Sequence, residues 1–518
     1  MYSEQIKTRA SLPQTLYHSQ QIKIFESKAA MLSGVTLYGL MQRAGEACLA
    51  VLKMHFCDAK QILIFTGKGN NGGDGYILAQ LAKQAGLSVQ LCQMGSSYDL
   101  RGDAAIARDS WLAAGGCIES VTEADFSRAD LLVDALLGTG FTGELRPEYQ
   151  ILIEQINESS IAVLSVDLPS GLDANCGTLH SHAVKAQATV SFVGLKQGLF
   201  TGHANDYCGQ IYFTGLGISA QFSKLASSEV SRIGYQELCV HLLPRSRYCH
   251  KGMFGRVLLV GGNLGMSGAV RLAGEAALRS GAGLVKILTR VENQGYINIG
   301  CPELMVIIQE QQKNFMDWPT HLVIGPGLGQ DVWAQQLFKL ITMSELPCVV
   351  DADALNLLAE NNLYKNNWVL TPHPGEAAKL LACTVQDIEA DRFAAVRKIQ
   401  RRFGGIVILK GAGSLICDHQ HIYVANVGNP GMASGGMGDL LSGIIVALLA
   451  QGLNPLVAVQ LAVCLHGEAG DLAARYEQRG LLASDLFPYI KKLVNPKCLN
   501  YLQKNYKMQS RPSYLADD

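Results

Sequence analysis

Short apolar runs recur between residues 17 and 215 and alternate with amphipathic stretches that are long enough to form helices. Apolar runs joined in this way are typical of parallel strands that are covered by helices on both faces. The pattern therefore predicts an α/β domain of the Rossmann-like, three-layer kind, with a parallel sheet in the middle. The expected strands are QILIFTG (61–67), LSVQLCQ (87–93), ADLLVDALLG (129–138), IAVLSVDLPSG (161–171) and ATVSFVG (188–194).

Residues 217–250 are more polar than the rest of the chain and contain no strong strand, so the alternation of strand and helix patterns is weaker there. A second series of alternating strand and helix patterns follows. We therefore expect two domains, residues 1–222 and 223–505, and a C-terminal tail at 506–518. The strands expected in the second domain are RVLLVGG (256–262), LVKILTR (284–290), HLVIGPGLG (321–329), CVVDADALN (348–356), WVLTPHPGE (368–376), IVILKGAG (406–413) and HIYVANVG (421–428).

The most apolar part of the chain, residues 440–465, is interrupted by Ser442, Gln451, Asn454 and Pro455. These polar and helix-breaking positions predict two buried helices joined by a turn, not a membrane span.

Composition narrows the class of protein. Hydrophobic residues make up 48% of the 518 residues and charged residues 17%, which is typical of a well-buried globular protein. The net charge of −1 gives no reason to expect a nucleic-acid partner. No two of the 14 cysteines form a C-x-x-C pair, so free thiols in a reducing compartment fit better than zinc or disulfides. We expect a cytoplasmic protein without nucleic-acid or membrane partners. A homo-oligomer is a further expectation, which composition does not determine.

The glycine-rich stretch GKGNNGGDG (67–75) follows the first expected strand and precedes a helical pattern. Its glycines match the G-x-G-x-x-G spacing of dinucleotide-binding proteins, but no Asp or Glu occurs from Tyr76 to Tyr98 to hold a ribose. No Lys-Ser/Thr pair follows the glycines, so the stretch is not a Walker A loop either. It is instead a polar loop that can face a ligand with amide oxygens, a carboxylate and bare backbone.

Two further strands end in an aspartate followed by glycine-rich chain, VDALLGTGFTGE (133–144) and VDLPSGLDANCG (166–177). The carboxyl ends of parallel strands share one edge, so Asp134 and Asp167 should lie near the first loop. Together with Ser170, these oxygens could hold a hard cation, and a spare carboxylate could move a proton. The alternative is that the aspartates cap helices and the glycines only form turns.

The stretch NPGMASGGMGDLLSG (429–443) places three glycines just before a long apolar helix. Free backbone N–H groups and the helix dipole make such a helix start an anion site. A carboxylate there, Asp439, makes sense if it takes a proton from a hydroxyl that attacks a phosphoryl group. The alternative is an N-cap aspartate after a flexible turn.

Other strand ends carry supporting features: IGPGLG (324–329), LTPHPGEAAKL (370–380) and LKGAGS (409–414). His373 lies between two prolines in an expected loop, which suits a ligand contact. Lys410 could bind phosphate, although the same segment could bind a nucleotide through its backbone alone.

With LYGLMQRAG (37–45), the three N-terminal motifs resemble the NAD(P)H-hydrate epimerase family over about residues 15–215. The resemblance implies a potassium ion held by Asn71, Asp134 and Ser170, and Asp167 is the expected acid/base residue. Lys196 could assist, although a lysine in such a loop is more often a surface charge, and Glu26 stands where aspartate is expected. The implied substrate contacts are Asn70, Asn71, Gly72, Gly73, Asp74, Gly138, Thr139, Gly140, Phe141, Thr142, Gly143, Glu144, Tyr149 and Asp167.

The second half resembles the ribokinase-like superfamily, in which the aspartate of a G-x-G-D motif is the base, and most closely its ADP/ATP-dependent NAD(P)H-hydrate dehydratases. Residues 250–285 extend the likeness across the first strand and helix. The resemblance implies substrate contacts at Ala269, Gly327, His373 and Asp439. It also implies Mg²⁺, for which Asp351, Asp353 and Glu376 are candidate ligands, although each is more easily explained as structural. The implied nucleotide contacts are Lys410, Gly411, Ala412, Gly413, Ser414 and Gly438.

As a whole, the chain resembles the bifunctional NAD(P)H-hydrate repair enzymes. The implied substrates are NADHX and NADPHX, whose nicotinamide ring has added water at C6. The first domain would interconvert their R and S forms, and the second would phosphorylate the S form and eliminate phosphate. The likeness favours ADP over ATP as the donor, with AMP and phosphate as products, but no residue decides between them. Two alternatives remain: a ribokinase-like small-molecule kinase with a regulatory N-terminal domain, and a binding module in the N-terminal half.

Overall fold

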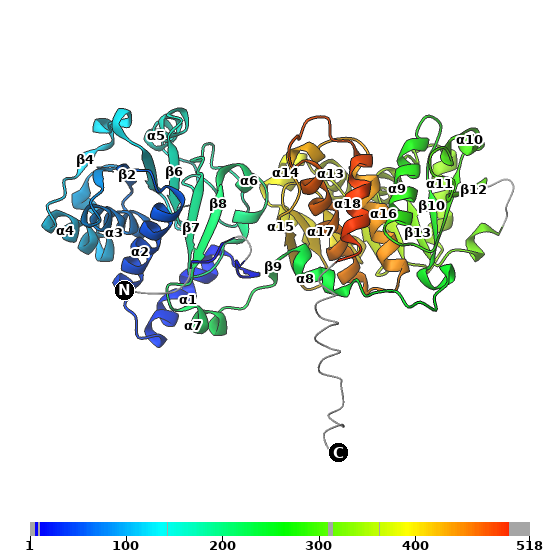
Figure 1. The fold of residues 1–518 in the computed structure, drawn as a ribbon, viewed down its shortest axis with the longest axis horizontal. Helices are drawn as coiled ribbons and strands as arrows, with labels where there is room; N and C mark the ends of the chain where they lie inside the picture. The colour runs from blue at the N-terminus through cyan, green and yellow to red at the C-terminus, as the bar shows by residue number, and fades with distance from the viewer. Residues whose placement is uncertain (1–5, 9–10, 142, 309–313, 362, 497–518) are drawn as a thin grey trace, which may run out of the picture. The chain divides into compact units, whose positions relative to one another are not determined.

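The computed structural model describes the chain except residues 1–5, 9–10, 142, 309–313, 362 and 497–518. The expected tail at 506–518 therefore lies outside the described residues. Internal contacts divide the chain into two compact units, residues 1–232 and 233–518 (Figure 1).

The first unit is built on a seven-stranded sheet in the order β4-β3-β2-β5-β6-β7-β8, in which all pairs are parallel. All the strands expected there form. An antiparallel pair that is not part of this seven-stranded sheet joins β1 (Thr15–Leu16) to β9 (Val230–Ile233), a short strand in the polar stretch where none was expected. The sheet strands are β2 (Gln61–Thr66), β3 (Ser88–Gln93), β4 (Glu119–Ser120), β5 (Leu131–Ala135), β6 (Ala162–Val166), β7 (Ala188–Phe192) and β8 (Gln210–Thr214).

Alternate residues of a strand point to opposite faces of the sheet, and here both faces are buried. On β2, Ile62 and Ile64 belong to one apolar cluster, whereas Leu63 and Phe65 belong to another. This is why the strand sequences are apolar without alternation. The helices of the unit are α1 (Ser19–Leu32), α2 (Leu37–His55), α3 (Asn70–Gln84), α4 (Gly102–Ala113), α5 (Pro147–Glu158), α6 (Ala204–Tyr207) and α7 (Ser219–Leu225).

In the second unit the strands follow the order β18-β17-β16-β15-β14-β13-β10-β11-β12. The pairs from β16 through β12 are parallel, and β16, β17 and β18 pair antiparallel. The expected strands form, and β12 and β17 are additional. The strands are β10 (Arg256–Val260), β11 (Leu284–Thr289), β12 (Met305–Ile308), β13 (His321–Ile324), β14 (Cys348–Val350), β15 (Trp368–Leu370), β16 (Ile406–Leu409), β17 (Ser414–Cys417) and β18 (Ile422–Ala425).

Parallel strands alternate with helices in both units, which confirms the expected α/β class. The longest helices of the second unit form its core. The apolar stretch 440–465 forms most of α16 and α17, which are largely buried, as expected. By length and composition alone, α17 could cross a membrane, but most of its apolar window is buried inside the unit. The helices are α8 (Tyr235–Leu238), α9 (Ser267–Arg279), α10 (Gln294–Ile297), α11 (Val332–Thr342), α12 (Asp353–Ala359), α13 (Pro374–Leu381), α14 (Val385–Ala390), α15 (Arg392–Phe403), α16 (Met437–Ala450), α17 (Pro455–Ala473) and α18 (Phe487–Leu493).

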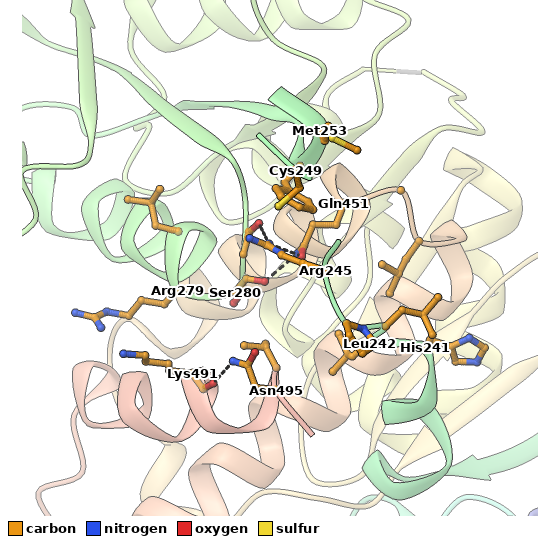
Figure 2. A pocket seen from close by; sticks show the side chains of 18 of the residues that line it. His241, Leu242, Arg245, Cys249, Met253, Arg279, Ser280, Gln451, Lys491 and Asn495 are labelled. Atoms are coloured by element: carbon orange, nitrogen blue, oxygen red, sulfur yellow. Dashed lines mark hydrogen bonds between the residues drawn. The ribbon is translucent and has the colours of Figure 1, made fainter. Parts of the chain in front are cut away.

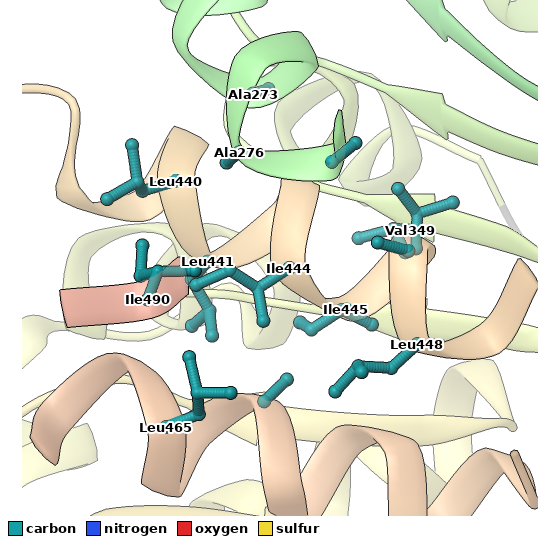
Figure 3. Packing of buried hydrophobic residues seen from close by; sticks show 14 of the residues in the cluster. Ala273, Ala276, Val349, Leu440, Leu441, Ile444, Ile445, Leu448, Leu465 and Ile490 are labelled. Atoms are coloured by element: carbon teal, nitrogen blue, oxygen red, sulfur yellow. The ribbon is translucent and has the colours of Figure 1, made fainter. Parts of the chain in front are cut away.

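Helix α16 packs closely against α9 because it carries a glycine at the crossing. Figure 3 shows α16 side chains such as Ile444 and Leu448 packed among residues of α9, β14, α17 and α18. A Cβ on Gly443 would lie 2.1 Å from the carbonyl oxygen of Ala273, so any side chain there would push α9 away. The glycine therefore fixes the position of the helix that carries Asp439.

We expect Gly443→Ala to lower the free energy of unfolding of the second unit by about 1–3 kcal/mol, the usual cost of overpacking. Gly268→Ala is the matched control, because a Cβ on Gly268 in α9 would meet nothing within 4 Å. Calorimetric melting of the two variants provides the measurement. Equal melting temperatures would contradict the packing argument.

Candidate active sites

In the first unit, the glycine-rich loop is shaped by close backbone approaches. A Cβ on Gly67 would lie 1.8 Å from the carbonyl oxygen of Leu136, and one on Gly72 would lie 2.1 Å from that of Gly67. No side chain fits at either position, so these glycines are required by the fold. The loop leads directly into α3, which begins at Asn70 and places Asp74 in its first turns.

A cavity of about 620 Å³ opens at the carboxyl ends of β2, β5, β6 and β7. The structure brings most of the expected substrate contacts to it, and α1 adds Glu26. Gly72, Gly73, Gly143 and Glu144 do not line the cavity, and Thr142 lies outside the described residues. The expected contacts that line it are Asn70, Asn71, Asp74, Gly138, Thr139, Gly140, Phe141, Tyr149 and Asp167.

Asp167 and Lys196 form a buried ion pair at the cavity. The expectation that Lys196 is a surface charge is wrong, because the residue is only 1% exposed and its ammonium donates a hydrogen bond to Asp167 Oδ1. The same ammonium donates to Ser191 Oγ at 3.2 Å and to the carbonyl oxygen of Phe192 at 3.1 Å. Asp167 has a φ of +67° and also accepts a hydrogen bond from the Phe192 N–H. Such a backbone is strained for a non-glycine residue and is common at functional sites.

Asn71 and Ser170 both contact the backbone of Leu137, and Asp134 is hydrogen-bonded to Ser170. Ser170 Oγ donates to Asp134 Oδ1 at 2.5 Å, and the Asn71 side-chain amide donates to the Leu137 carbonyl at 3.0 Å. Asp134 is fully buried, and burial raises the pKa of its carboxyl although hydrogen bonds from Ser170, Leu136 and Ser165 oppose the rise. The donor set of carboxylate, hydroxyl and carbonyl oxygens fits a hard cation such as potassium.

In the second unit, Asp439 lies in the first turn of α16, close to the end of β16. The interpretation of Asp439 as an N-cap is wrong, because Gly436, with a φ of +89°, occupies that position. A Cβ on Gly438 would lie 3.1 Å from Lys410 Nζ, so this helix start and the lysine are neighbours. Burial and the nearby carboxylate of Asp351 raise the pKa of Asp439 to about 7, against the opposing effect of Lys410.

Lys410 is held by carboxylates from two neighbouring strand ends. Its Nζ lies 3.1 Å from Asp351 Oδ1 and 3.8 Å from Glu376 Oε2. Ser442 of α16 donates to Asp351 Oδ2 at 2.8 Å, which ties the helix to the same pair. Burial acts to lower the pKa of Lys410, but Asp351 and Glu376 outweigh it, so the pKa is raised and the lysine stays charged. The sequence did not predict that Ser442 binds Asp351.

The remaining expected contacts of the second unit lie on turns and at the starts of helices. Gly327, with a φ of +58°, would place a Cβ 3.3 Å from Cβ of Ala269, so the two expected substrate contacts are neighbours. His373, expected in a loop, is the N-cap of α13, and its Nδ1 accepts hydrogen bonds from the N–H groups of Gly375 and Glu376. In the expected nucleotide segment 410–414, residues 410–413 form the turn between β16 and β17, and Ser414 begins β17.

The three candidate magnesium ligands already have protein partners. Asp351 pairs with Lys410, Asp353 accepts the N–H of Gly329, and Glu376 accepts the N–H of His373. Among the described residues, no group of three or more His, Cys, Asp or Glu side chains is arranged to hold a metal ion.

The sequence did not predict that a buried histidine lies near Lys410. His466 of α17 is 9% exposed, and its Nε2 has no hydrogen-bond partner among the described residues. Burial, with a smaller contribution from Lys410, lowers the pKa of this imidazole to about 4, so it is neutral at physiological pH.

The second unit also contains a cavity of about 1230 Å³ (Figure 2), and Asp439 is not among the residues that line it. Its lining includes Arg245, Ser280 and Gln451, and Arg245 donates to Gln451 Oε1 at 2.9 Å. Gln451 is the C-cap of α16, whereas Asp439 lies in the first turn of that helix. At about 1.5 Å per residue, the helix separates the two by about 20 Å. This cavity is therefore not part of the Asp439 site.

We expect Lys196→Met to lower the free energy of unfolding of the first unit by about 3–5 kcal/mol, because it strands the Asp167 carboxylate in a buried site. The double variant with Asp167→Asn should recover part of the loss. Hydrogen exchange of β6 and β7 in urea provides the measurement.

Lys68→Met is the matched control, because it breaks the exposed ion pair with Asp99 and should cost at most about 1 kcal/mol. Equal losses for Lys196→Met and Lys68→Met would contradict the assignment of a buried pair.

Comparison with known proteins identifies the family of both units. Residues 257–492 match the family model described as NAD(P)H-hydrate dehydratase, and residues 37–198 match the model described as YjeF-related protein N-terminus. A "Bifunctional NAD(P)H-hydrate repair enzyme Nnr" of Escherichia coli strain K12 is 44% identical, covering 95% of this chain and 96% of the relative. A protein of the same name from Coxiella burnetii is 43% identical, covering 93% and 99%.

A solved structure of a ribokinase-like superfamily protein from Enterococcus faecalis V583 is 31% identical, covers 52% of this chain and 99% of its own, and has a TM-score of 0.49. The two family models together with relatives of this identity and coverage are decisive, and the chain belongs to the family of bifunctional NAD(P)H-hydrate repair enzymes.

Proposed function

We propose that the chain converts hydrated NADH and NADPH back to NADH and NADPH in two steps. The first unit epimerises the hydrates, and the second dehydrates them with a nucleotide. The observation that carries the proposal is the same in both units. Each places an aspartate and a lysine together at the carboxyl edge of a parallel sheet, beside glycine-rich chain, and in the first unit these residues line a cavity.

In the first unit, Asp167 acts as the acid/base group on the hydrate. Lys196 and the Phe192 N–H hold its carboxylate at the cavity wall, where a substrate hydroxyl can reach it. The polar residues Asn70, Asn71 and Asp74 and the turn at Gly138–Phe141 contact the dinucleotide. Asn71, Asp134 and Ser170 would hold a potassium ion, which when bound orders the loops that carry them.

In the second unit, Asp439 accepts the proton of the C6 hydroxyl of the S hydrate as that oxygen attacks the terminal phosphorus of ADP. AMP leaves, and the C6 phosphate is then eliminated, because phosphate is a much better leaving group than hydroxide. The amides at the start of α16 and the ammonium of Lys410 stabilise the negative charge of the transferred group. The ring is neither oxidised nor reduced.

The substrate and nucleotide contacts of this unit follow from the same arrangement. Gly327, Ala269 and His373 contact the nicotinamide hydrate, and Gly438 with the turn 410–414 contacts the nucleotide. Asp351, Asp353 and Glu376 are engaged by protein groups, so a magnesium ion would be held by the nucleotide phosphates, whose negative charge it would offset. The thirteen described cysteines are all free thiols, which fits a reducing cytoplasm.

Asp439→Asn should lower kcat for dehydration of S-NADHX by about 10²–10⁴-fold, the usual contribution of a general base. A base must be ionised, and the pKa of Asp439 is raised to about 7, so the rate should rise with pH through about 7 and level off above it. The near-ultraviolet absorbance of the reduced nicotinamide follows the reaction. A stable phosphorylated dinucleotide in place of NADH and phosphate would contradict the proposal and favour a small-molecule kinase.

Asp167→Asn should slow the conversion of R-NADHX to S-NADHX by about 10²–10⁴-fold. Recovery of NADH from purified S-NADHX should stay unchanged, since that step belongs to the other unit. Chromatographic separation of the two epimers measures the first quantity. Unchanged interconversion would remove Asp167 from the chemistry and favour a binding role for the first unit.

A further inference from the structure

Four carboxyl groups from separate elements border the cavity of the first unit: Glu26 of α1, Asp74 of α3, Asp103 of α4 and Asp167 after β6. Lys196 pairs with only one of them, Asp167. A lysine ammonium has three N–H donors, and those of Lys196 are used by Asp167 Oδ1, Ser191 Oγ and the carbonyl oxygen of Phe192. The ammonium therefore has no donor left for a second carboxylate.

Asp74 has neither an ion-pair partner nor a hydrogen-bond donor within the part of the chain that the structure describes. Burial raises the pKa of Asp74 well above its usual value, and the charges of Asp167 and Glu26 raise it further, with Lys196 opposing. A carboxyl group without compensation in such a place is more stable with its proton than without it. The cavity thus presents, side by side, a carboxyl group that favours its protonated form and an aspartate that is paired with a lysine.

We propose that Asp74 is the proton donor of the epimerase and that Asp167 is its proton acceptor. This inference rests on the proposed function of the first unit and assigns the two halves of its proton transfer.

The epimerisation can then proceed without water or redox chemistry. C6 of the hydrate carries a hydroxyl and is bonded to ring nitrogen N1. Asp167 takes the hydroxyl proton, the C6–N1 bond breaks with its electron pair going to N1, and Asp74 gives its proton to N1, leaving an aldehyde at C6. After rotation about C5–C6, N1 attacks the other face of the aldehyde, Asp74 recovers its proton, and Asp167 returns one to the oxygen. Every proton and electron pair is restored, so both carboxyl groups are ready for another turnover.

Other titratable groups lie near Asp74 and Asp167 and also contribute to the pH dependence of the reaction. Glu26 is the nearest matched control, because it also lines the cavity and burial raises its pKa. The remaining ones are Lys23, Cys48, Lys68, Asp103, Arg146, Tyr149 and Lys196.

The test compares Asp74→Asn, Asp74→Glu and Glu26→Gln in the full chain. Asp74→Asn should lower kcat for R-to-S conversion about 100-fold or more with little change in KM, whereas loss of a mere binding contact would raise KM and spare kcat. Dehydration of S-NADHX by the same samples should be unchanged, since that step belongs to the second unit, and unchanged calorimetric melting should show that the first unit of each variant is folded.

The pH profile separates the donor from its neighbours. A donor must be protonated, so the wild-type rate should fall as pH rises through the raised pKa of Asp74. Asp74→Glu and Glu26→Gln should keep this fall, and Asp74→Asn should lose it. If Asp74→Asn keeps it, or if Glu26→Gln is the variant that loses it, the assignment is overturned.

The proton can also be observed without turnover. At neutral pH the infrared C=O stretch of protonated carboxyl groups should be weaker in Asp74→Asn than in the wild type, because one such group is lost, and an unchanged band would overturn the inference. Absence of any R-to-S conversion by the wild type would instead overturn the proposed function and this inference with it. Conversion that survives Asp74→Asn would overturn this inference alone.

Discussion

A lysine ammonium held against an aspartate carboxylate organises the carboxyl edge of each parallel sheet. Placing a charge in a poorly hydrated site is costly unless a partner of opposite sign is fixed beside it. Lys196 after β7 reaches Asp167 after β6, and Lys410 after β16 reaches Asp351 after β14. Each pair therefore ties together chain segments that leave nearby strands, and the loops that carry the chemistry cannot move independently of it.

The glycines allow loops at these sheet edges to approach one another closely. Gly67 approaches the carbonyl of Leu136, and Gly325 would place a Cβ 1.7 Å from the carbonyl oxygen of Asp351. These contacts bring loops of neighbouring strands into backbone contact beside each ion pair. The two units share no sequence repeat, yet both reach the same arrangement, because the carboxyl edge of a parallel sheet offers the same geometry to each.

Much of this architecture could be predicted from the sequence, and what was missed has physical reasons. Long apolar runs and glycine-rich turns are local signals, so the main strands and the start of α16 were found. Burial of Lys196 depends on a partner 29 residues away, and the network of Asp351, Lys410 and Ser442 joins residues up to 91 positions apart. Such contacts exist only after folding. Strand β9 was missed because it is four residues long and mostly half-buried.

The central claim is that the two units act in sequence on one metabolite, and the wild-type chain can test it directly. A mixture of R-NADHX and S-NADHX is incubated with ADP or with ATP, and the reduced nicotinamide is followed by its near-ultraviolet absorbance. The account predicts that the whole mixture returns to NADH, with one phosphate released for each molecule recovered. Recovery that stops at the S fraction would contradict the role of the first unit, and accumulation of a phosphorylated dinucleotide would contradict the role of the second.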